Sequence, residues 1–230
     1  MTKTNKVPDR YGFIDAQVGI HLDLERLVIS HCSSVYRRPI ADHTRVAFDQ
    51  FLKFTVGARP VILDAGCGTG LSTRLLAERY KDAVVIGVDR SAARLKNATG
   101  GRDNYRILRA NLVDLWRLMA ASDIRVKKTY LLYPNPYPKR SQLRSRWHGH
   151  PIFHQLLATT EAIELRSNWQ VYVAEFAQAV SLVKSRFGLR PESEVSDEIE
   201  SYHTHTPITV FERRYLTAAC PVYRYFTKLR

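Results

Sequence analysis

The chain has 230 residues, of which 45% are hydrophobic and 25% are charged, so it is long enough for one folded domain, and its composition excludes the disordered and fibrous classes. Thirty-five Lys and Arg against 22 Asp and Glu give a formal net charge of +13, which predicts a polyanionic partner, most often nucleic acid, or else a basic solvated surface. Three widely spaced cysteines without a C-x-x-C pair exclude a disulfide framework and a zinc site, so no metal is expected.

The first sixty residues predict an arm and two helices before the first strand. Residues 1–20 are polar and contain proline and glycines, so we expect a flexible arm that orders on binding or remains a disordered tail. Apolar residues at helical spacing over 22–32 and 42–56 predict an N-terminal helical cap, residues 21–58, of a single domain that extends to residue 230. No apolar run approaches eighteen residues and no signal-peptide core is present, so we expect a cytoplasmic protein without a membrane segment.

Residues 61–70, VILDAGCGTG, predict a buried strand that feeds a tight turn and then a helix. The apolar start lacks polar alternation, as in a parallel strand covered on both faces. Gly66, Gly68 and Gly70 permit backbone angles and a close ligand approach that a Cβ would block. The spacing G-x-G-x-G is not the G-x-G-x-x-G of a dinucleotide site, and alone it is also compatible with a plain strand-to-helix turn.

Two acids support a binding function for this turn. Asp64 closes the first strand, and Asp89 ends a second apolar run at nineteen residues beyond Gly70. An acid at the tip of the second strand is placed to hold a ribose diol through charge-assisted hydrogen bonds. The pattern therefore predicts a nucleoside-binding βαβ unit.

The segments LDAGCGTG and GVDRS resemble the first two motifs of class I S-adenosylmethionine-dependent methyltransferases. The resemblance implies that the glycine turn passes under the amino-acid part of the cofactor and that Asp89 holds its ribose. The tighter glycine spacing suits a ligand without a pyrophosphate, so S-adenosylmethionine is expected and a nicotinamide cofactor is not.

Beyond the turn, helices and strands alternate regularly. Helices are expected over 91–98 and 112–121, and strands over 84–88, 105–109 and 128–133. The predicted fold is α/β, a doubly wound, mostly parallel seven-stranded Rossmann-like methyltransferase sheet with ligands at the carboxyl ends of its strands. Asn111 follows the third strand, where it is expected to read the adenine edge, to cap the next helix, or to do both.

The fourth strand runs into the stretch YPNPYPKRSQLRSRWHGH, residues 133–150. Three prolines predict a stiff extended loop at the rim of the site. The basic residues that follow have no acid among them and lie near two aromatic residues: Lys139, Arg140, Arg144 and Arg146 with Tyr137 and Trp147. This mixture suits phosphate contacts and base stacking, although a random run of surface charge has the same composition.

The remainder predicts a helix over 153–163, a fifth strand over 170–174 with Glu175 at its tip, and a helix over 176–187. The acidic stretch 192–200 is expected to be a solvated loop or a rim that repels partners. Residues 206–212 and 222–227 are expected to form an antiparallel pair of strands at the edge of the sheet.

Two segments resemble the tRNA (guanine-N7-)-methyltransferases: PNPYPK at 134–139 matches their P-D-P-W-P-K segment, and TVFER at 209–213 matches their T-x-F-E segment. The resemblance implies a tRNA or other structured RNA substrate and a monomer or homodimer. The residues that it implies for the cofactor are Asp64, Gly66, Gly68, Gly70, Asp89, Arg90 and Asn111. Those implied for catalysis and base positioning are Asn135, Tyr137 and Glu212, and those for the substrate are Lys139, Arg144, Arg146, Thr209 and Glu175.

The departures from this family bear on the substrate. Asn135 and Tyr137 stand where the family has Asp and Trp, and Glu175 stands at its Thr-Asp segment. Guanine N7 has a lone pair and no proton to remove, so transfer needs alignment and not a general base. Asn accepts more weakly than Asp and also donates, so Asn135 either preserves transfer with less discrimination or recognises another base.

Two alternatives remain open. Asn135-Pro136-Tyr137 resembles, with one proline missing, the N-P-P-Y signature of methyltransferases that act on exocyclic amines of bases. The second alternative is a degenerate homologue that binds RNA or cofactor without methyl transfer. The replaced acid of the proline loop favours it, and the intact glycine turn with Asp89 opposes it.

Overall fold

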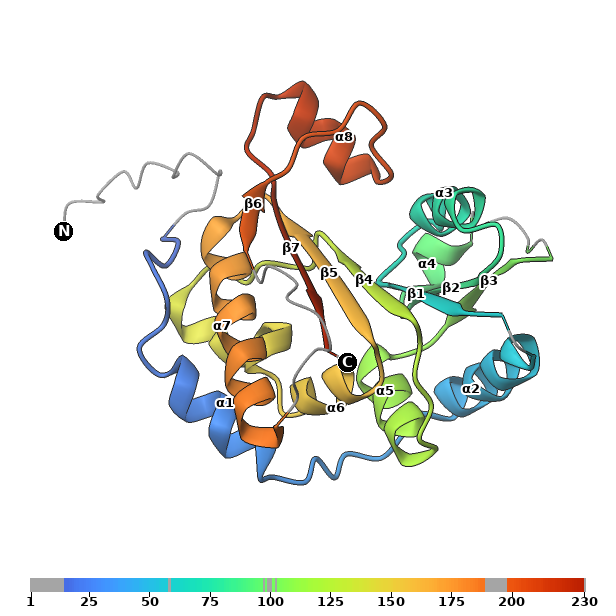
Figure 1. Ribbon diagram of the computed structural model, residues 1–230, viewed down its shortest axis with the longest axis horizontal. Coiled ribbons are helices and arrows are strands. Elements are labelled where there is room, and N and C mark those ends of the chain that lie inside the picture. Colours follow the sequence, from blue (N-terminus) through green and yellow to red (C-terminus); the bar gives the residue numbers. More distant parts are fainter. Residues whose placement is uncertain are drawn as a thin grey trace.

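A computed structural model describes residues 15–57, 59–96, 98, 101, 103–188 and 198–229. Seven strands form one sheet in the order β3-β2-β1-β4-β5-β7-β6, with helices against both faces (Figure 1). The strands are β1 (Val61–Ala65), β2 (Val84–Asp89), β3 (Tyr105–Arg109), β4 (Lys128–Leu132), β5 (Ala162–Ser167), β6 (Ile199–Ser201) and β7 (Tyr223–Lys228). The helices are α1 (Leu24–Cys32), α2 (Asp42–Thr55), α3 (Leu71–Arg79), α4 (Ala92–Leu95), α5 (Leu112–Ala121), α6 (Phe153–Ala158), α7 (Gln170–Phe187) and α8 (Val210–Thr217), with 3-10 turns η1 (Arg140–Ser145) and η2 (Trp147–Gly149).

The direction of the strands places the site. β1 to β5 pair in parallel, and β7 runs antiparallel to both β5 and β6. The strand order reverses between β1 and β4, and a parallel α/β sheet binds ligands outside the carboxyl ends at such a switch point. The mostly parallel fold with an antiparallel edge pair is thus confirmed.

Alternate residues of the central strands are buried against different helical layers. Leu63 and Ile86 belong to the larger core, which α1, α2, α5, α6 and α7 cover. Ile62 and Val85 belong to a smaller core with Leu76 of α3. Burial on both faces explains why these strands show no polar alternation.

The fifth strand was predicted at the wrong place. Residues 170–174 form the first turns of α7, and the strand is β5, Ala162–Ser167. Glu164 and Arg166 lie inside β5 and pair with each other, so the segment does not read as an apolar strand. Within the run VYVA that suggested a strand, Tyr172 and Val173 are buried because α7 packs on α1 and on the sheet.

The antiparallel pair of strands differs from the prediction in one of its two strands. Residues 206–212, predicted as a strand, form a loop and the start of α8, while β7 pairs with β6. β6 comes from the end of the acidic stretch, where Glu200 forms an ion pair with Arg224 of β7. Residues 192–197 of that stretch lie outside the described residues.

The two N-terminal helices are present as predicted, and α1 packs on α7 while α2 packs on α5 and β3. Residues 1–14 of the expected arm lie outside the described residues. Gln17, by contrast, is buried, and its backbone N–H donates to the Pro138 carbonyl at 2.8 Å. The arm is therefore docked at Gln17 and is not free up to residue 20. Among the described helices, none combines the length and apolar character that crossing a membrane requires.

Candidate active site

A cleft of about 470 Å³ opens at the carboxyl ends of the parallel strands. Its walls come from the ends of β1 and β2, the start of α5, the loop after β4 and the connection between α1 and α2. Of the residues predicted to form the site, those that line the cleft are Gly66, Asp89, Arg90, Asn111, Asn135, Tyr137 and Arg144. Among the described residues, no group of three or more histidine, cysteine or acidic side chains is placed to hold a metal ion.

The three glycines of the turn do different things. All have positive φ, but a Cβ at Gly66 or Gly68 would meet no atom within 4 Å. A Cβ at Gly70 would lie 2.3 Å from the Ile107 side chain, so Gly70 is needed for packing against β3. The turn thus leaves open space at Gly66 and Gly68, and Gly66 lines the cleft.

Asp64 lies beneath the turn and does not line the cleft. Its carboxylate accepts hydrogen bonds from Ser72 Oγ at 2.6 Å and Thr73 Oγ1 at 2.7 Å, in the first turn of α3. Burial raises the pKa of Asp64 to about 6, against the effect of these two hydroxyls. Its geometry is that of a residue that ties the glycine turn to α3.

Asp89 is buried at the wall of the cleft in a fixed orientation. Its carboxylate accepts from the backbone N–H groups of Gly68 at 3.0 Å and Ser91 at 2.8 Å. Arg94 pairs with it at 3.2 Å but keeps most of its side chain exposed. The turn after β1 and the tip of β2 are therefore joined through this one carboxylate.

Asn111 lies both at the start of α5 and at the wall of the cleft. Its Oδ1 accepts from the Val113 N–H at 3.0 Å, which caps α5, and the residue lines the cleft. One turn further on, Asp114 accepts the Ala41 N–H at 3.1 Å. This bond holds the connection between α1 and α2 over the cleft.

The loop after β4, residues 133–139, is here called the proline loop. Tyr133 and Tyr137 both have left-handed backbone angles, with φ of 52° and 45°. Such angles cost energy for bulky residues and persist only where the surroundings impose them. Asn135 accepts the Tyr137 N–H at 3.4 Å, a weak contact, so its side chain keeps hydrogen-bonding capacity toward the cleft.

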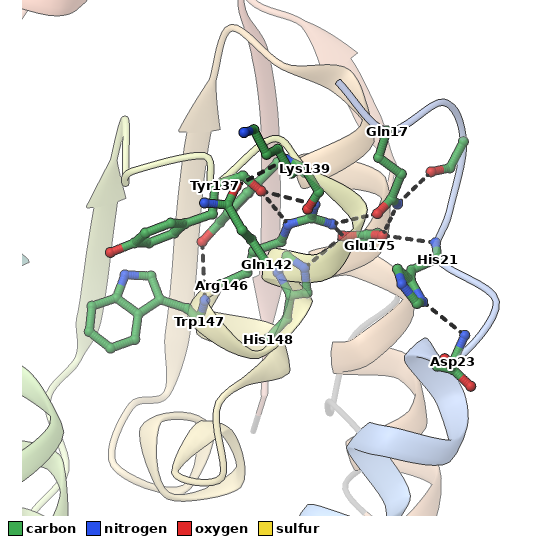
Figure 2. Close-up of polar contacts among 12 residues, drawn as sticks. Gln17, His21, Asp23, Tyr137, Lys139, Gln142, Arg146, Trp147, His148 and Glu175 are labelled. Atoms are coloured by element: carbon green, nitrogen blue, oxygen red, sulfur yellow. Dashed lines mark hydrogen bonds and ion pairs between the residues drawn. The ribbon is translucent and has the colours of Figure 1, made fainter. Parts of the chain in front are cut away.

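Arg146 supports the proline loop from within the protein and is not an exposed phosphate ligand, as Figure 2 shows. Its guanidinium donates to the Tyr137 carbonyl at 3.1 and 3.0 Å and to the Lys139 carbonyl at 3.1 Å. It also forms a fully buried ion pair with Glu175. The prediction for Arg146 was wrong because its place in a basic run gave no sign of this buried partner.

Glu175 lies in α7, deep under the proline loop, and not at a strand tip on the ligand edge. It accepts from His148 Nε2 at 2.9 Å, Gln17 Nε2 at 2.6 Å and the His21 N–H at 2.8 Å (Figure 2). Burial alone would raise the pKa of Glu175, but the bonds and charges of His148 and Arg146 outweigh it and lower the pKa to about 2. The sequence carries no signal for Gln17 or His21 as partners.

The T-x-F-E segment forms a helix start and a buried anchor. Thr209 Oγ1 accepts the Glu212 N–H at 2.9 Å, and the Glu212 carboxylate accepts the Ile208 N–H at 2.7 Å, a reciprocal cap of α8. Glu212 is fully buried and also binds Arg166 at 2.7 Å and the Tyr133 hydroxyl at 3.0 Å. Thr209 and Glu212 were expected in the site, but neither of them lines the cleft. They are connected to it through Tyr133.

The exposed charges around the cleft are basic. Four exposed arginines line it: Arg38, Arg90, Arg94 and Arg144. Lys139 is exposed but lies outside the lining. The two acids that line the cleft, Asp89 and Asp114, are buried. An entering ligand therefore meets positive charge at the mouth.

Two curated relatives match part of the chain. The trans-aconitate 2-methyltransferase of Acidovorax sp. (strain JS42) is 34% identical over 91 residues, which is 40% of this chain and 35% of that protein. The enzyme of the same name from Yersinia pestis (strain Pestoides F) is 36% identical over 83 residues, 36% of this chain and 32% of that protein. The chain thus spans about a third of the length of these relatives.

Solved structures of low identity share the fold. The 16S rRNA methyltransferase KamB has a TM-score of 0.54 at 16% identity, covering 84% of this chain and 95% of that one. A 16S rRNA (adenine(1408)-N(1))-methyltransferase from Catenulisporales acidiphilia, with its cosubstrate S-adenosylmethionine, also has a TM-score of 0.54 at 16% identity, covering 79% and 91%.

A family model covers most of the sheet and most of the cleft lining. Residues 58–225 match the model of the family Methyltransf_4, described as "Putative methyltransferase". The chain therefore belongs to the Methyltransf_4 family.

Proposed function

We propose that the protein transfers the methyl group of S-adenosylmethionine to a base in structured RNA, with guanine N7 of tRNA as the first candidate. The observation that carries the proposal is the mouth of the cleft, where exposed arginines surround the proline loop with Asn135 and Tyr137. Arginine binds phosphate through bidentate hydrogen bonds, and an aromatic ring stacks on any base. The net charge of +13 agrees with a polyanionic substrate.

The residues present fit the cofactor. The open space above Gly66 and Gly68 leaves room for its amino-acid part. Asp89 is held at the wall by backbone donors and has oxygen lone pairs left for a ribose diol. Asn111 lines the same cleft, and we propose that it reads the adenine edge. Asp64 and Gly70 act indirectly, because they fix the turn.

Bound S-adenosylmethionine supplies an electrophilic methyl group, so the protein must align an acceptor lone pair with it. Guanine N7 offers such a lone pair without deprotonation, which agrees with a cleft whose lining acids are both buried and hydrogen-bonded. Asn135 would bind the Watson–Crick edge of the base and Tyr137 would stack on it. Arg144 would bind phosphate at the mouth, and Lys139 would do so outside it.

A second candidate acceptor is a small polycarboxylate. The curated relatives are named for trans-aconitate, and four exposed arginines also suit carboxylates. RNA ranks first because a compact acid would not require basic residues beyond the cleft, such as Lys139 and Arg140.

The test is incubation with isotopically labelled S-adenosylmethionine and either unmodified total tRNA or trans-aconitate, followed by digestion of the RNA to nucleosides and mass spectrometry. We expect labelled 7-methylguanosine. Labelled N6-methyladenosine or N2-methylguanosine would move the acceptor to an exocyclic amine. Label in trans-aconitate alone, or in no product despite cofactor binding, would overturn the RNA proposal.

A further inference from the structure

Helix α8 presents large apolar side chains to solvent at the end of the sheet where the cleft opens. Phe211 is 55% exposed and Val210 is 61% exposed. The register of β7 opposite β5, with Tyr223 beside Ser167, puts the segment before β7 at the carboxyl end of the parallel strands. Figure 1 shows α8 standing beyond that end of the sheet, clear of both helical layers. An exposed aromatic ring at this position indicates a binding function.

Three rings lead from this surface to the cleft. Phe211 stacks on Tyr215 with 6.5 Å between ring centroids and 26° between planes. Tyr215 contacts Tyr133 at 5.6 Å. Tyr133 lines the cleft, so the outer ring and the site belong to one aromatic series.

The helix is fixed before any ligand arrives. Glu212, one turn from Tyr215, is buried and bonded to Arg166 of β5 and to the Tyr133 hydroxyl. Such anchoring reduces the entropy that a ligand must overcome when it binds the exposed face. The position of Phe211 is thus set by the same buried carboxylate that holds Tyr133.

The charge on this face is positive. The only acid of α8 is Glu212, and it is buried against Arg166. Arg213 and Arg214 are exposed, and no described acid forms an ion pair with either. Arg214 follows Phe211 by three residues and shares its face of the helix, whereas Arg213 lies on another side. An aromatic ring beside an exposed arginine is a combination that binds single-stranded nucleic acid, since every base has a face to stack and every nucleotide a phosphate.

We propose that Phe211, with Arg214 on the same helix face, is a stacking platform for an unpaired nucleotide that flanks the base held in the cleft. This inference rests on the proposed RNA substrate. It adds to it a requirement for single-stranded RNA beside the target and a second contact outside the cleft. The continuity of the ring series with the cleft favours a nucleotide of the same strand over a protein partner.

The test uses short oligoribonucleotides that carry 2-aminopurine next to a guanosine, either unpaired or within a hairpin stem. Stacking quenches 2-aminopurine fluorescence. We expect quenching of the unpaired probe by the wild-type protein and by Phe211→Trp, and its loss in Phe211→Ala with an affinity decrease on the order of tenfold. The matched control is Val210→Ala, which removes a neighbouring exposed apolar side chain without a ring and should retain quenching.

Each further outcome decides one claim. Undiminished quenching in a folded Phe211→Ala, or an equal loss in Val210→Ala, overturns the platform while the RNA proposal stands. Failure of the wild-type protein to bind either probe, with S-adenosylmethionine binding intact, overturns the RNA substrate itself. If Phe211→Ala does not fold, Phe211→Leu keeps most of the apolar contact and still removes the ring. Arg214→Ala should lower the salt dependence of binding, with Arg213→Ala as the neighbouring control, and an unchanged slope in Arg214→Ala would contradict the role of this cation.

Discussion

Arg146 joins the buried carboxylate of Glu175 to the main-chain carbonyl of Tyr137, with the guanidinium fully removed from solvent. The ion pair thus holds the left-handed backbone of the proline loop in place from beneath. The Arg146 charge at the base of the cleft therefore stabilises the conformation of the proline loop and makes no contact with solvent.

Glu175→Gln should lower the free energy of unfolding by about 3–5 kcal/mol, because it leaves the buried Arg146 charge without its partner. Urea denaturation measures the change. Glu78→Gln, at an exposed site of α3, is the matched control and should stay within about 0.5 kcal/mol. Arg146→Met in the Glu175→Gln background should cost less than the sum of the single changes, and simple additivity would argue against the pair.

Acid should destabilise the protein partly through His150. Burial, with a smaller effect of His31, lowers the pKa of His150 to about 4 from 6.5. Unfolded His150 gains its proton near pH 6.5 and folded His150 only near 4, so its contribution to stability is lost as the pH falls through this window. The stability difference between wild type and His150→Gln should therefore shrink between pH 7 and 4.5. A stability difference between the two proteins that stays constant with pH would contradict this prediction.

Glu175 and Asp64 also affect how the stability of the protein depends on pH. Glu175, with its pKa lowered to about 2, loses its contribution to stability as the pH falls from the ordinary glutamate pKa of 4.5 toward 2. Asp64, with its pKa raised to about 6, works in the opposite direction, since protonation relieves its buried charge. Measurements of unfolding in urea at several pH values on Asp64→Asn separate its effect from that of His150.

Asp89→Asn should weaken S-adenosylmethionine binding by about tenfold or more, because it removes the charge that would hold the ribose diol. Calorimetric titration with the cofactor measures the loss. RNA affinity should persist, since the arginines at the mouth are unchanged. Asp82→Asn, an exposed acid in the turn before β2, serves as the control. Equal cofactor affinity in both variants would remove Asp89 from the cofactor site.

Arg144 and Arg146 should behave differently although only Ser145 separates them. Arg144→Ala should lower the slope of log Kd against log salt for RNA by about one, with little change in stability. Arg146→Ala should instead destabilise the protein, because it leaves Glu175 unpaired. Arg79→Ala, an exposed arginine at the far end of α3, should leave both quantities unchanged.

Asn135→Asp should favour guanine over adenine as the methyl acceptor by about fivefold, because a carboxylate accepts more strongly from the N1 and N2 hydrogens of guanine. The ratio of labelled products from matched oligonucleotides measures the preference. Asn135→Ala removes the side chain and should lower the rate on both bases. A preference that shifts toward adenine in the Asp variant would show that Asn135 does not contact the Watson–Crick edge of guanine.

Local patterns were sufficient where neighbouring residues determine the structure. The glycine turn and Asp89 were predicted correctly in place, since the apolar runs and glycine spacings that position them lie within thirty residues. The mostly parallel sheet and the alternation of its first four strands with helices followed from the same periodicity. Cap geometry at Asn111 followed from its position before an apolar helix.

Burial of charge could not be predicted in this way. Arg146 and Glu175 are 29 positions apart, and Gln17 is 158 positions from Glu175. Arg166 and Glu212 are 46 positions apart. Each side chain alone resembles a surface charge, and only the fold brings it to its partner. Strand β5 was missed for the same reason, because its two charged residues resemble surface charges. The apolar start of α7 was predicted as the fifth strand instead.

The proline loop is braced at two points by groups from opposite ends of the chain. Glu212 and Arg166 hold it at Tyr133, while Gln17, Arg146 and Glu175 hold it at Pro138 and Tyr137. The smallest unit that could be grafted into a related methyltransferase to transfer the proposed base recognition is therefore discontinuous. An exchange of residues 133–139 alone would carry Asn135 and Tyr137 into the new protein without the supports that hold the loop in its conformation.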